Sequence, residues 1–194
     1  MNNLKTTIKS IFLLILTFYN FNIALAQDYK VALADSKLIV LGTSNLHDWE
    51  IDAKSMSGKS NLSLEAGELK AIKSLDFSVE VEQLKSGKKG MDNNTYKALN
   101  SAMYKNITYK LTNVSKISKS SDNYTVETIG DLTICGVTKK INQSFQVKII
   151  GKKAIFNGKT KIDMTTYGVK PPTALLGTIK TGKDVTVNFN IAYN

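Results

Sequence analysis

The residues with the greatest chemical potential lie in one short stretch, GTSNLHDWEIDA, at positions 42–53. It holds the only His and the only Trp of the chain, His47 and Trp49. An imidazole can act as a general base, ligate a metal or hydrogen-bond to a ligand. The stretch is therefore a candidate catalytic site, metal site or cavity wall.

A metal site is a poor fit to this composition. Zinc sites need three or four ligands drawn from His, Cys and carboxylates. The only other His or Cys is Cys135, which lies at a distant predicted turn. We therefore expect no metal ion and no cofactor, and a packing role for Cys135.

Catalysis at His47 also lacks supporting residues, because no nucleophile elbow or other local signature accompanies it. If residues 47–54 form a strand, side chains alternate between its two faces. One face then holds His47, Trp49, Ile51 and Ala53, and the other holds Asp48, Glu50 and Asp52. The acidic face points to water, so His47 is predicted to point inward, where it either hydrogen-bonds to backbone or contacts a ligand headgroup. We do not expect an enzyme.

Alternating apolar and polar residues dominate the chain after Gln27, which is typical of antiparallel strands with one buried face. The clearest cases are SLDFSVEV (74–81), ITYKLT (107–112), INQSFQVKI (141–149) and VTVNFNIAY (185–193), and further strands are expected at 37–42, 47–54, 58–65, 124–134 and 153–163. About eight such strands are most economically buried in a sandwich or a closed barrel. An eight-stranded barrel is either filled by side chains or holds one small ligand.

The same alternation predicts which side chains line the interior. They are Leu75, Phe77, Val79, Ile107, Tyr109, Leu111, Phe145, Val147, Phe156, Val187 and Phe189, with Gln143 the one polar member of its inward set. Alternation does not distinguish a hollow barrel from a filled one. Two functions follow: a cavity that binds one small ligand, or a non-binding stress-response or interaction module with a filled core.

Two segments interrupt the strands. MDNNTYKALNSAMYKN (91–106) has Tyr96 and Leu99 at helical spacing, with Asp92 as a possible N-cap, and predicts one short helix across an end of the sheet. The connection 164–183 before the last strand is much longer than a hairpin loop. Its apolar residues, among them Tyr167, Val169, Leu175, Leu176 and Ile179, are candidates to cover the barrel mouth.

Residues 1–26 have the features of a secretory signal peptide: a short basic segment, an apolar core and an Ala24-Leu25-Ala26 cleavage site. This predicts a mature domain at 27–194 in the periplasm or outside the cell. Removing Lys5 and Lys9 lowers the net charge from +10 to +8.

All 26 basic residues of the chain are Lys. Nucleic-acid readers rely on Arg for bidentate contacts, so no nucleic-acid partner is expected. The lysines group at predicted turns, where they keep strand edges soluble and favour weak attraction to an anionic membrane surface.

The order of several motifs is similar to that of a known family. SKLIVLGTSNLHDWEIDA, GDLTICGVTKKI, KIDMTTYGVKPP and GKDVTVNFNI resemble the bacterial YceI family of lipocalin-like, polyisoprenoid-binding proteins. The resemblance spans essentially all of 27–194. It implies an exported, eight-stranded antiparallel lipocalin-like barrel with one short helix insertion and a long loop before the last strand. Its interior would hold an extended apolar chain.

The resemblance favours the hollow barrel and a carrier or storage function for an isoprenoid-like lipid or fatty acyl derivative. The protein is then expected to be a monomer or homodimer that contacts membrane surfaces transiently. The family segment before the helix usually carries Arg and His, whereas KGMDNNTYKAL has Lys89 and Asp92. Candidate ligand-binding residues are His47, Trp49, Leu75, Phe77, Val79, Ile107, Tyr109, Leu111, Phe145, Val147, Phe156, Tyr167, Leu176, Val187 and Phe189.

Overall fold

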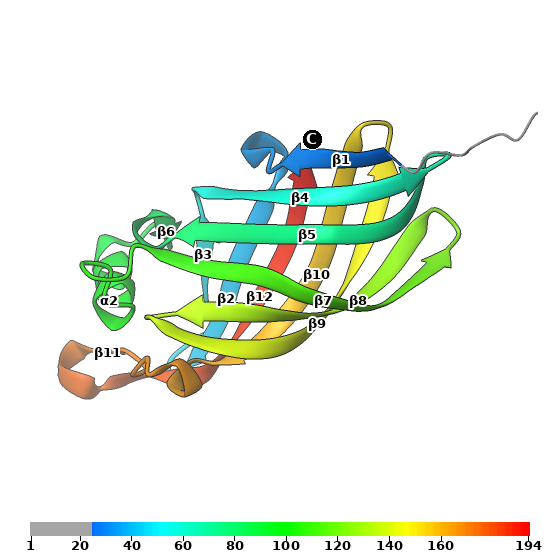
Figure 1. Ribbon diagram of the computed structural model, residues 1–194. Helices are drawn as coiled ribbons and strands as arrows, with labels where there is room; N and C mark the ends of the chain where they lie inside the picture. The colour runs from blue at the N-terminus through cyan, green and yellow to red at the C-terminus, as the bar shows by residue number, and fades with distance from the viewer. Residues whose placement is uncertain (1–24) are drawn as a thin grey trace, which may run out of the picture.

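The computed structural model describes residues 25–194, which form a strongly curled antiparallel sheet and one α-helix (Figure 1). Residues 1–24, most of the predicted signal peptide, lie outside the described residues. The strands are β1 (Leu25–Lys30), β2 (Lys37–Ser44), β3 (Trp49–Ala53), β4 (Met56–Glu65), β5 (Glu68–Glu80), β6 (Leu84–Lys85), β7 (Asn106–Ser120), β8 (Asn123–Ile134), β9 (Val137–Ile150), β10 (Lys153–Asp163), β11 (Thr173–Ala174) and β12 (Ile179–Tyr193). The helix is α2 (Lys89–Ala98), and short 3₁₀ helices are η1 (Leu33–Asp35), η2 (Val81–Gln83), η3 (Met164–Tyr167) and η4 (Leu175–Gly177).

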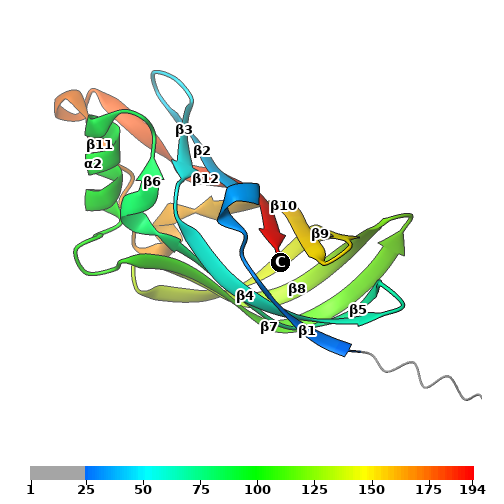
Figure 2. The same ribbon diagram turned by 90° about the horizontal axis from the view of Figure 1, so that it is seen from above.

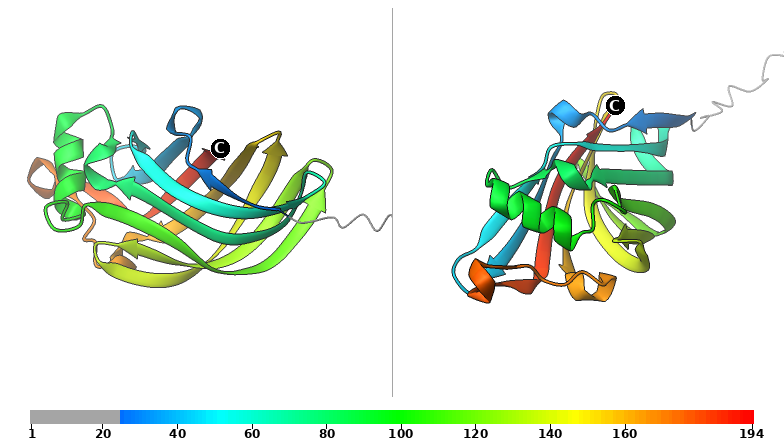
Figure 3. Two further views of the ribbon diagram at one scale, coloured as in Figure 1. Left: turned by 45° about the horizontal axis from the view of Figure 1, so that its top comes forward. Right: turned by 90° about the vertical axis from the view of Figure 1, so that its left-hand side faces the viewer.

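Strand pairing makes the sheet curl back on itself. The order is β1-β4-β5-β7-β8-β9-β10-β12-β2-β3-β6, with β11 beside β12. Only Lys54 and Ser55 separate β3 from β4, yet β3 pairs with β2 and β4 pairs with β5. This corner brings the two arms of the sheet together, and the strong curl is visible from above and from the side (Figures 2 and 3).

The predicted count of eight strands is not confirmed, because the sheet has twelve strands. The nine segments predicted as strands correspond to nine observed strands, although the predictions 47–54 and 74–81 extend beyond the ends of β3 and β5. The strands that were not predicted are β1, β6 and β11. β6 and β11 have two residues each, which is too short for an alternating pattern to reveal them. The last strand begins at Ile179, inside the predicted connection 164–183.

The first strand fastens the sheet to the end of the chain. β1 pairs with β4 along its length. The backbone N–H of Lys30 donates to Asn194 O, and the N–H of Asn194 donates to Lys30 O, both at 2.9 Å. Val31 forms an isolated bridge with Tyr193. β1 therefore joins the β4 edge to the end of β12.

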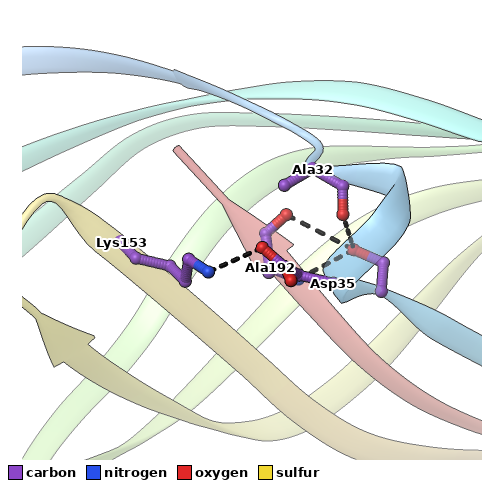
Figure 4. A network of polar contacts seen from close by, with 5 residues as sticks. Ala32, Asp35, Lys153 and Ala192 are labelled. Carbon is purple, nitrogen blue, oxygen red and sulfur yellow. Dashed lines mark hydrogen bonds and ion pairs between the residues drawn. The ribbon is translucent and has the colours of Figure 1, made fainter.

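A small polar network around η1 reinforces this junction (Figure 4). The hydroxyl of Ser36 donates to Ala32 O at 2.8 Å and accepts from the N–H of Ala192 at 3.0 Å. Next to it, Lys153 Nζ lies 2.6 Å from Asp35 Oδ2 and links β10 to η1. These contacts hold η1 against the ends of β10 and β12.

The predicted short helix is present as α2, which lies across one end of the curled sheet (Figure 3). The predicted N-cap at Asp92 is wrong, since Lys88 occupies that position. Asp92 lies in the first turn, where its carboxylate accepts from the N–H and the hydroxyl of Ser86. Tyr96 Oη donates to Leu84 O at 2.9 Å and accepts from Lys85 Nζ at 2.7 Å, which anchors α2 to β6. No helix within residues 25–194 is long and apolar enough to cross a membrane.

Aromatic side chains from β9, β10 and β12 pack together at the end of the interior away from α2. Phe145 and Phe156 stack with ring centroids 5.3 Å apart, and Phe156 and Tyr193 approach to 4.9 Å. Phe189 meets Phe145 edge to face at 6.5 Å. These four residues form the deep aromatic cluster, which closes this end of the interior.

Candidate ligand-binding site

The curled sheet encloses a cavity of about 850 Å³. Strands β2, β3, β5, β7, β8, β9, β10 and β12 supply its walls, while α2 and residues 172–175 frame its mouth. Sites for small ligands are typically 300–1,000 Å³ in volume and mostly apolar. The interior is therefore hollow, and a filled core does not describe this structure.

Most of the residues predicted to line the interior do line this cavity. They are Trp49, Leu75, Phe77, Val79, Ile107, Tyr109, Phe145, Phe156, Val187 and Phe189. Leu111 and Val147 do not line it. Both follow a lining residue by two positions on the side away from α2, so they face inward, but they pack in the solid core beyond the cavity. Alternation predicts which face of a strand a residue lies on. It does not predict how far along the strand the cavity extends.

The prediction that His47 points inward from a strand is wrong. β3 begins at Trp49, and His47 lies in an exposed turn. Ser44 forms this turn, because its hydroxyl accepts from the N–H groups of Leu46 and His47 and donates to His47 O. The His47 ring nitrogen Nδ1 lies 2.7 Å from Asp48 O. His47 therefore stands at the rim of the cavity, and Trp49 stands inside it.

The predicted covering role of Tyr167 and Leu176 is also wrong. Tyr167 is buried against Leu132, Ile134 and Val169 in a small separate cluster beneath η3. Leu176 is fully exposed at the tip of η4, with a φ of 56°. Val169, Leu175 and Ile179, which the same prediction named, do line the cavity, as do Pro172, Thr173 and Ala174 of this connection.

Three strand glycines explain how large aromatic residues leave the interior open. A Cβ at Gly42 would lie 2.1 Å from the Trp49 ring, and one at Gly130 would lie 2.3 Å from the Tyr109 ring. At Gly158, the Phe189 ring would lie 2.7 Å away. Each ring therefore occupies space that a side chain at the glycine would fill. A glycine in a strand often marks such a close approach, and this signal was present in the sequence.

Polar side chains form a row across the interior surface of four neighbouring strands, and we call this row the polar belt. It consists of Tyr109 on β7, Thr128 on β8, Gln143 on β9 and Thr160 on β10. Tyr109 Oη lies 3.1 Å from Thr128 Oγ1, which donates to Gln143 O at 3.0 Å. Thr160 Oγ1 donates to Gln143 Oε1. Sequence patterning placed Tyr109 and Gln143 on the inward face. It did not single out Thr128 or Thr160, because threonine is common in strands.

The mouth is more polar than the walls. Ser44, His47, Asn93, Asn94 and Thr95 contribute to it. Among the described residues that line the cavity, Lys88 carries the only permanent charge. No group of three or more His, Cys, Asp and Glu side chains in residues 25–194 is placed to hold a metal ion.

Beside the mouth, Asp163 fastens the end of β10 to β12 and to η3. Its carboxylate accepts from Lys183 Nζ at 2.6 Å, from the Thr165 hydroxyl at 2.5 Å and from the Thr165 N–H at 3.0 Å. Hydrogen bonds, first from Lys183 and then from Thr165, lower the pKa of Asp163 to about 2. Its charge therefore survives to unusually low pH in the folded protein.

Acid is expected to weaken this junction. Because the folded-state pKa of Asp163 is lowered, its stabilising effect is complete above its unfolded pKa, about 4, and is lost as the pH falls towards about 2. The melting temperature of Asp163→Asn is therefore expected to fall less between these two pH values than that of the unaltered protein. Asp122→Asn, in the exposed turn after β7, serves as the control. An equal fall in melting temperature for the unaltered protein and Asp163→Asn would contradict the stabilising role of the Asp163 charge.

The fold and cavity together define a class: an antiparallel β-barrel protein with a hollow apolar interior. A family model for the YceI-like domain matches residues 29–193. The chain therefore belongs to the YceI-like family, and its curled sheet is the lipocalin-like fold of that family.

Solved structures show the same fold. A polyisoprenoid-binding domain from Saccharophagus degradans, implicated in plant cell wall breakdown, is 14% identical with a TM-score of 0.67, covering 86% of this chain and 97% of that chain. Burkholderia cenocepacia BcnA is 19% identical with a TM-score of 0.64, covering 84% of this chain and 98% of that chain. A Campylobacter jejuni YceI protein is 19% identical with a TM-score of 0.59, covering 73% and 82% respectively. No curated protein matched the chain significantly.

Proposed function

We propose that residues 27–194 form an exported, soluble and non-catalytic carrier or storage protein for an extended apolar lipid. The ligand class is an isoprenoid-like chain or a fatty acyl derivative. The observation that carries this proposal is the cavity of about 850 Å³, whose walls are mostly apolar. The polyisoprenoid-binding domain from Saccharophagus degradans, which shares the fold, supports the ligand class.

The energetics of an apolar cavity suit transfer more than permanent capture. Burial of one methylene contributes about 0.8 kcal/mol, so ten contribute about 8 kcal/mol before the entropy cost of binding. A lipid in a bilayer is already in an apolar medium, so moving it into the barrel changes its free energy little. The ligand can therefore leave a membrane and return to one.

The mouth carries features of a surface that contacts membranes. Leu175 is 71% exposed, and Leu46 in the β2–β3 turn is 64% exposed. Asn45 ties this turn to the start of β12, since its side chain donates to Thr178 O and accepts from Lys180 N–H. Leu46, Leu175 and Leu176 together are the leucine rim. The net positive charge of the protein favours its approach to anionic lipid, and the leucine rim would enter the interface transiently.

Transfer of a fluorescent polyprenol between vesicles tests the proposal. The protein is expected to accelerate transfer from anionic donor vesicles to acceptor vesicles in proportion to its concentration. Replacing Leu46, Leu175 and Leu176 by Ser removes apolar area from the membrane contact, and is expected to slow transfer about tenfold. Measurement follows the loss of donor fluorescence with time.

Ile150→Ser provides the matched control, because Ile150 is 50% exposed at the end of β9 and does not line the cavity. It is expected to transfer lipid at the unaltered rate. A transfer rate no higher with the protein than without it would refute the carrier function. An equal rate for the leucine-rim variant would refute the membrane contact alone.

A further inference from the structure

The polar belt lies partway along an otherwise apolar wall. On its mouth side the cavity is lined by Leu132, Ile134 and Ile162, and on its other side by the deep aromatic cluster. Thr128 and Gln143 are directly opposite each other on β8 and β9. Both are nearly inaccessible to solvent, with 2% and 9% of their surfaces exposed. Buried polar groups in such a place must have hydrogen-bond partners.

The hydrogen bonds fix the direction of the Gln143 amide. Gln143 Nε2 lies 2.8 Å from Ser144 O and 3.3 Å from Lys159 O. Backbone carbonyl oxygens only accept, so the NH₂ group must face them. The amide oxygen Oε1 then faces Thr160, whose hydroxyl must donate to it.

Every hydroxyl proton of the belt is therefore committed within the protein. Thr160 donates to Gln143 Oε1, and Thr128 donates to Gln143 O. Thr128 has one proton only, so Tyr109 Oη must be the donor in its contact with Thr128 Oγ1. What remains free on these oxygens is acceptor lone pairs. Of the four belt residues, Tyr109, Gln143 and Thr160 line the cavity.

We propose that the polar belt selects lipids that carry a neutral hydrogen-bond donor, a hydroxyl or an amide N–H, on an otherwise apolar chain. This inference rests on the proposed function and narrows its ligand class. A carboxylate or phosphate at this depth would find no hydrogen-bond donor on the belt. The acceptor lone pairs of the belt would repel its negatively charged oxygens. Lys88, the cation of the cavity lining, stands in the loop before α2 at the mouth and not beside the belt.

The ionisation behaviour of Tyr109 agrees with this geometry. Burial raises the pKa of Tyr109. The phenol therefore keeps its proton throughout the physiological range and continues to donate it to Thr128. The acceptor character of the belt does not change with pH.

Competition between matched probes tests the inference. Dodecanol, dodecanamide, methyl dodecanoate and dodecanoate are titrated at pH 8 against an apolar fluorescent dye bound to the full protein. One net hydrogen bond is expected to make dodecanol and dodecanamide bind about fivefold more tightly than the ester, which only accepts. Dodecanoate is expected to bind more weakly than the alcohol. Equal Kd values for dodecanol and methyl dodecanoate, or tighter binding of dodecanoate, would overturn the inference.

A variant locates the selectivity. Tyr109→Phe, Gln143→Leu and Thr160→Val together make the belt apolar, and are expected to remove the preference for dodecanol while the dye still binds. Thr181→Val, which lines the mouth, is the control that keeps the preference. If the folded belt variant still prefers dodecanol, the inference is overturned. If that variant does not fold, the probe affinities of the unaltered protein decide between the two outcomes. Failure of the dye and of every probe to bind would instead refute the proposed function.

Discussion

Tryptophans placed on opposite walls of the cavity are expected to abolish lipid binding. Ile107 on β7 and Val187 on β12 both line the cavity, and three strands, β8, β9 and β10, lie between theirs in the sheet. The double variant Ile107→Trp/Val187→Trp fills space that about four methylenes would occupy. Losing their burial costs about 3 kcal/mol, which lowers affinity at least about a hundredfold. Displacement of an apolar dye measures the change.

The fold is expected to tolerate this variant, because the added rings enter a cavity rather than a packed core. Lys110→Trp and Asn188→Trp, exposed positions on the same two strands, form the matched control. They are expected to bind the dye with unaltered affinity. Undiminished binding by a folded cavity variant would show that the ligand lies elsewhere on the protein.

The deep aromatic cluster is expected to supply the largest single contribution to stability. Phe156 is 3% exposed and contacts both Phe145 and Tyr193. Its replacement by Ala removes these contacts and leaves a void next to the cavity. Such Phe→Ala changes in cores lower the free energy of unfolding by about 3–5 kcal/mol. Urea denaturation measures this difference directly.

Ile155→Ala on the same strand is the comparison, because Ile155 alternates with Phe156 and lies on the outer face. Its effect is expected to stay below about 1 kcal/mol. The Phe156→Ala protein is also expected to keep binding apolar dye, since the change widens the cavity. Similar losses of stability for the two variants would contradict the role given to the cluster.

The strands and their inward faces were predictable from the sequence because a half-buried sheet requires alternation. The runs that contain Phe77, Tyr109, Phe145 and Phe189 alternate, with Gln143 as the one polar residue on their inward faces, and each lies on a cavity wall. The short helix was predictable from its change of period. The resemblance to the YceI family also predicted the membership that the family model shows.

Two features of the site did not follow from periodicity. His47 continues the alternation of β3, but hydrogen bonds between Ser44 and His47 turn the backbone before the strand begins. Leu176 looks like a cover for the mouth, but its φ of 56° places it at the exposed tip of η4. Local backbone geometry determines where the side chains of His47 and Leu176 lie. A pattern of apolar residues does not predict that geometry.

The presence of a cavity also could not be predicted from the alternation of residues. A filled barrel and a hollow one have the same inward residues, so alternation predicts both equally. In the structure, Trp49, Tyr109 and Phe189 occupy space next to glycines on neighbouring strands, which leaves more of the interior open. Those pairs depend on the register between strands, which a single strand pattern does not contain.

Native mass spectrometry of the protein purified from its own host tests the central claim most directly. We expect a folded chain with added mass. Organic extraction should release that mass as one apolar molecule that bears a hydroxyl or amide group. The Ile107→Trp/Val187→Trp variant, purified in parallel, is expected to appear as the bare chain. A bare chain for both proteins, with no apolar molecule in either extract, would contradict the account.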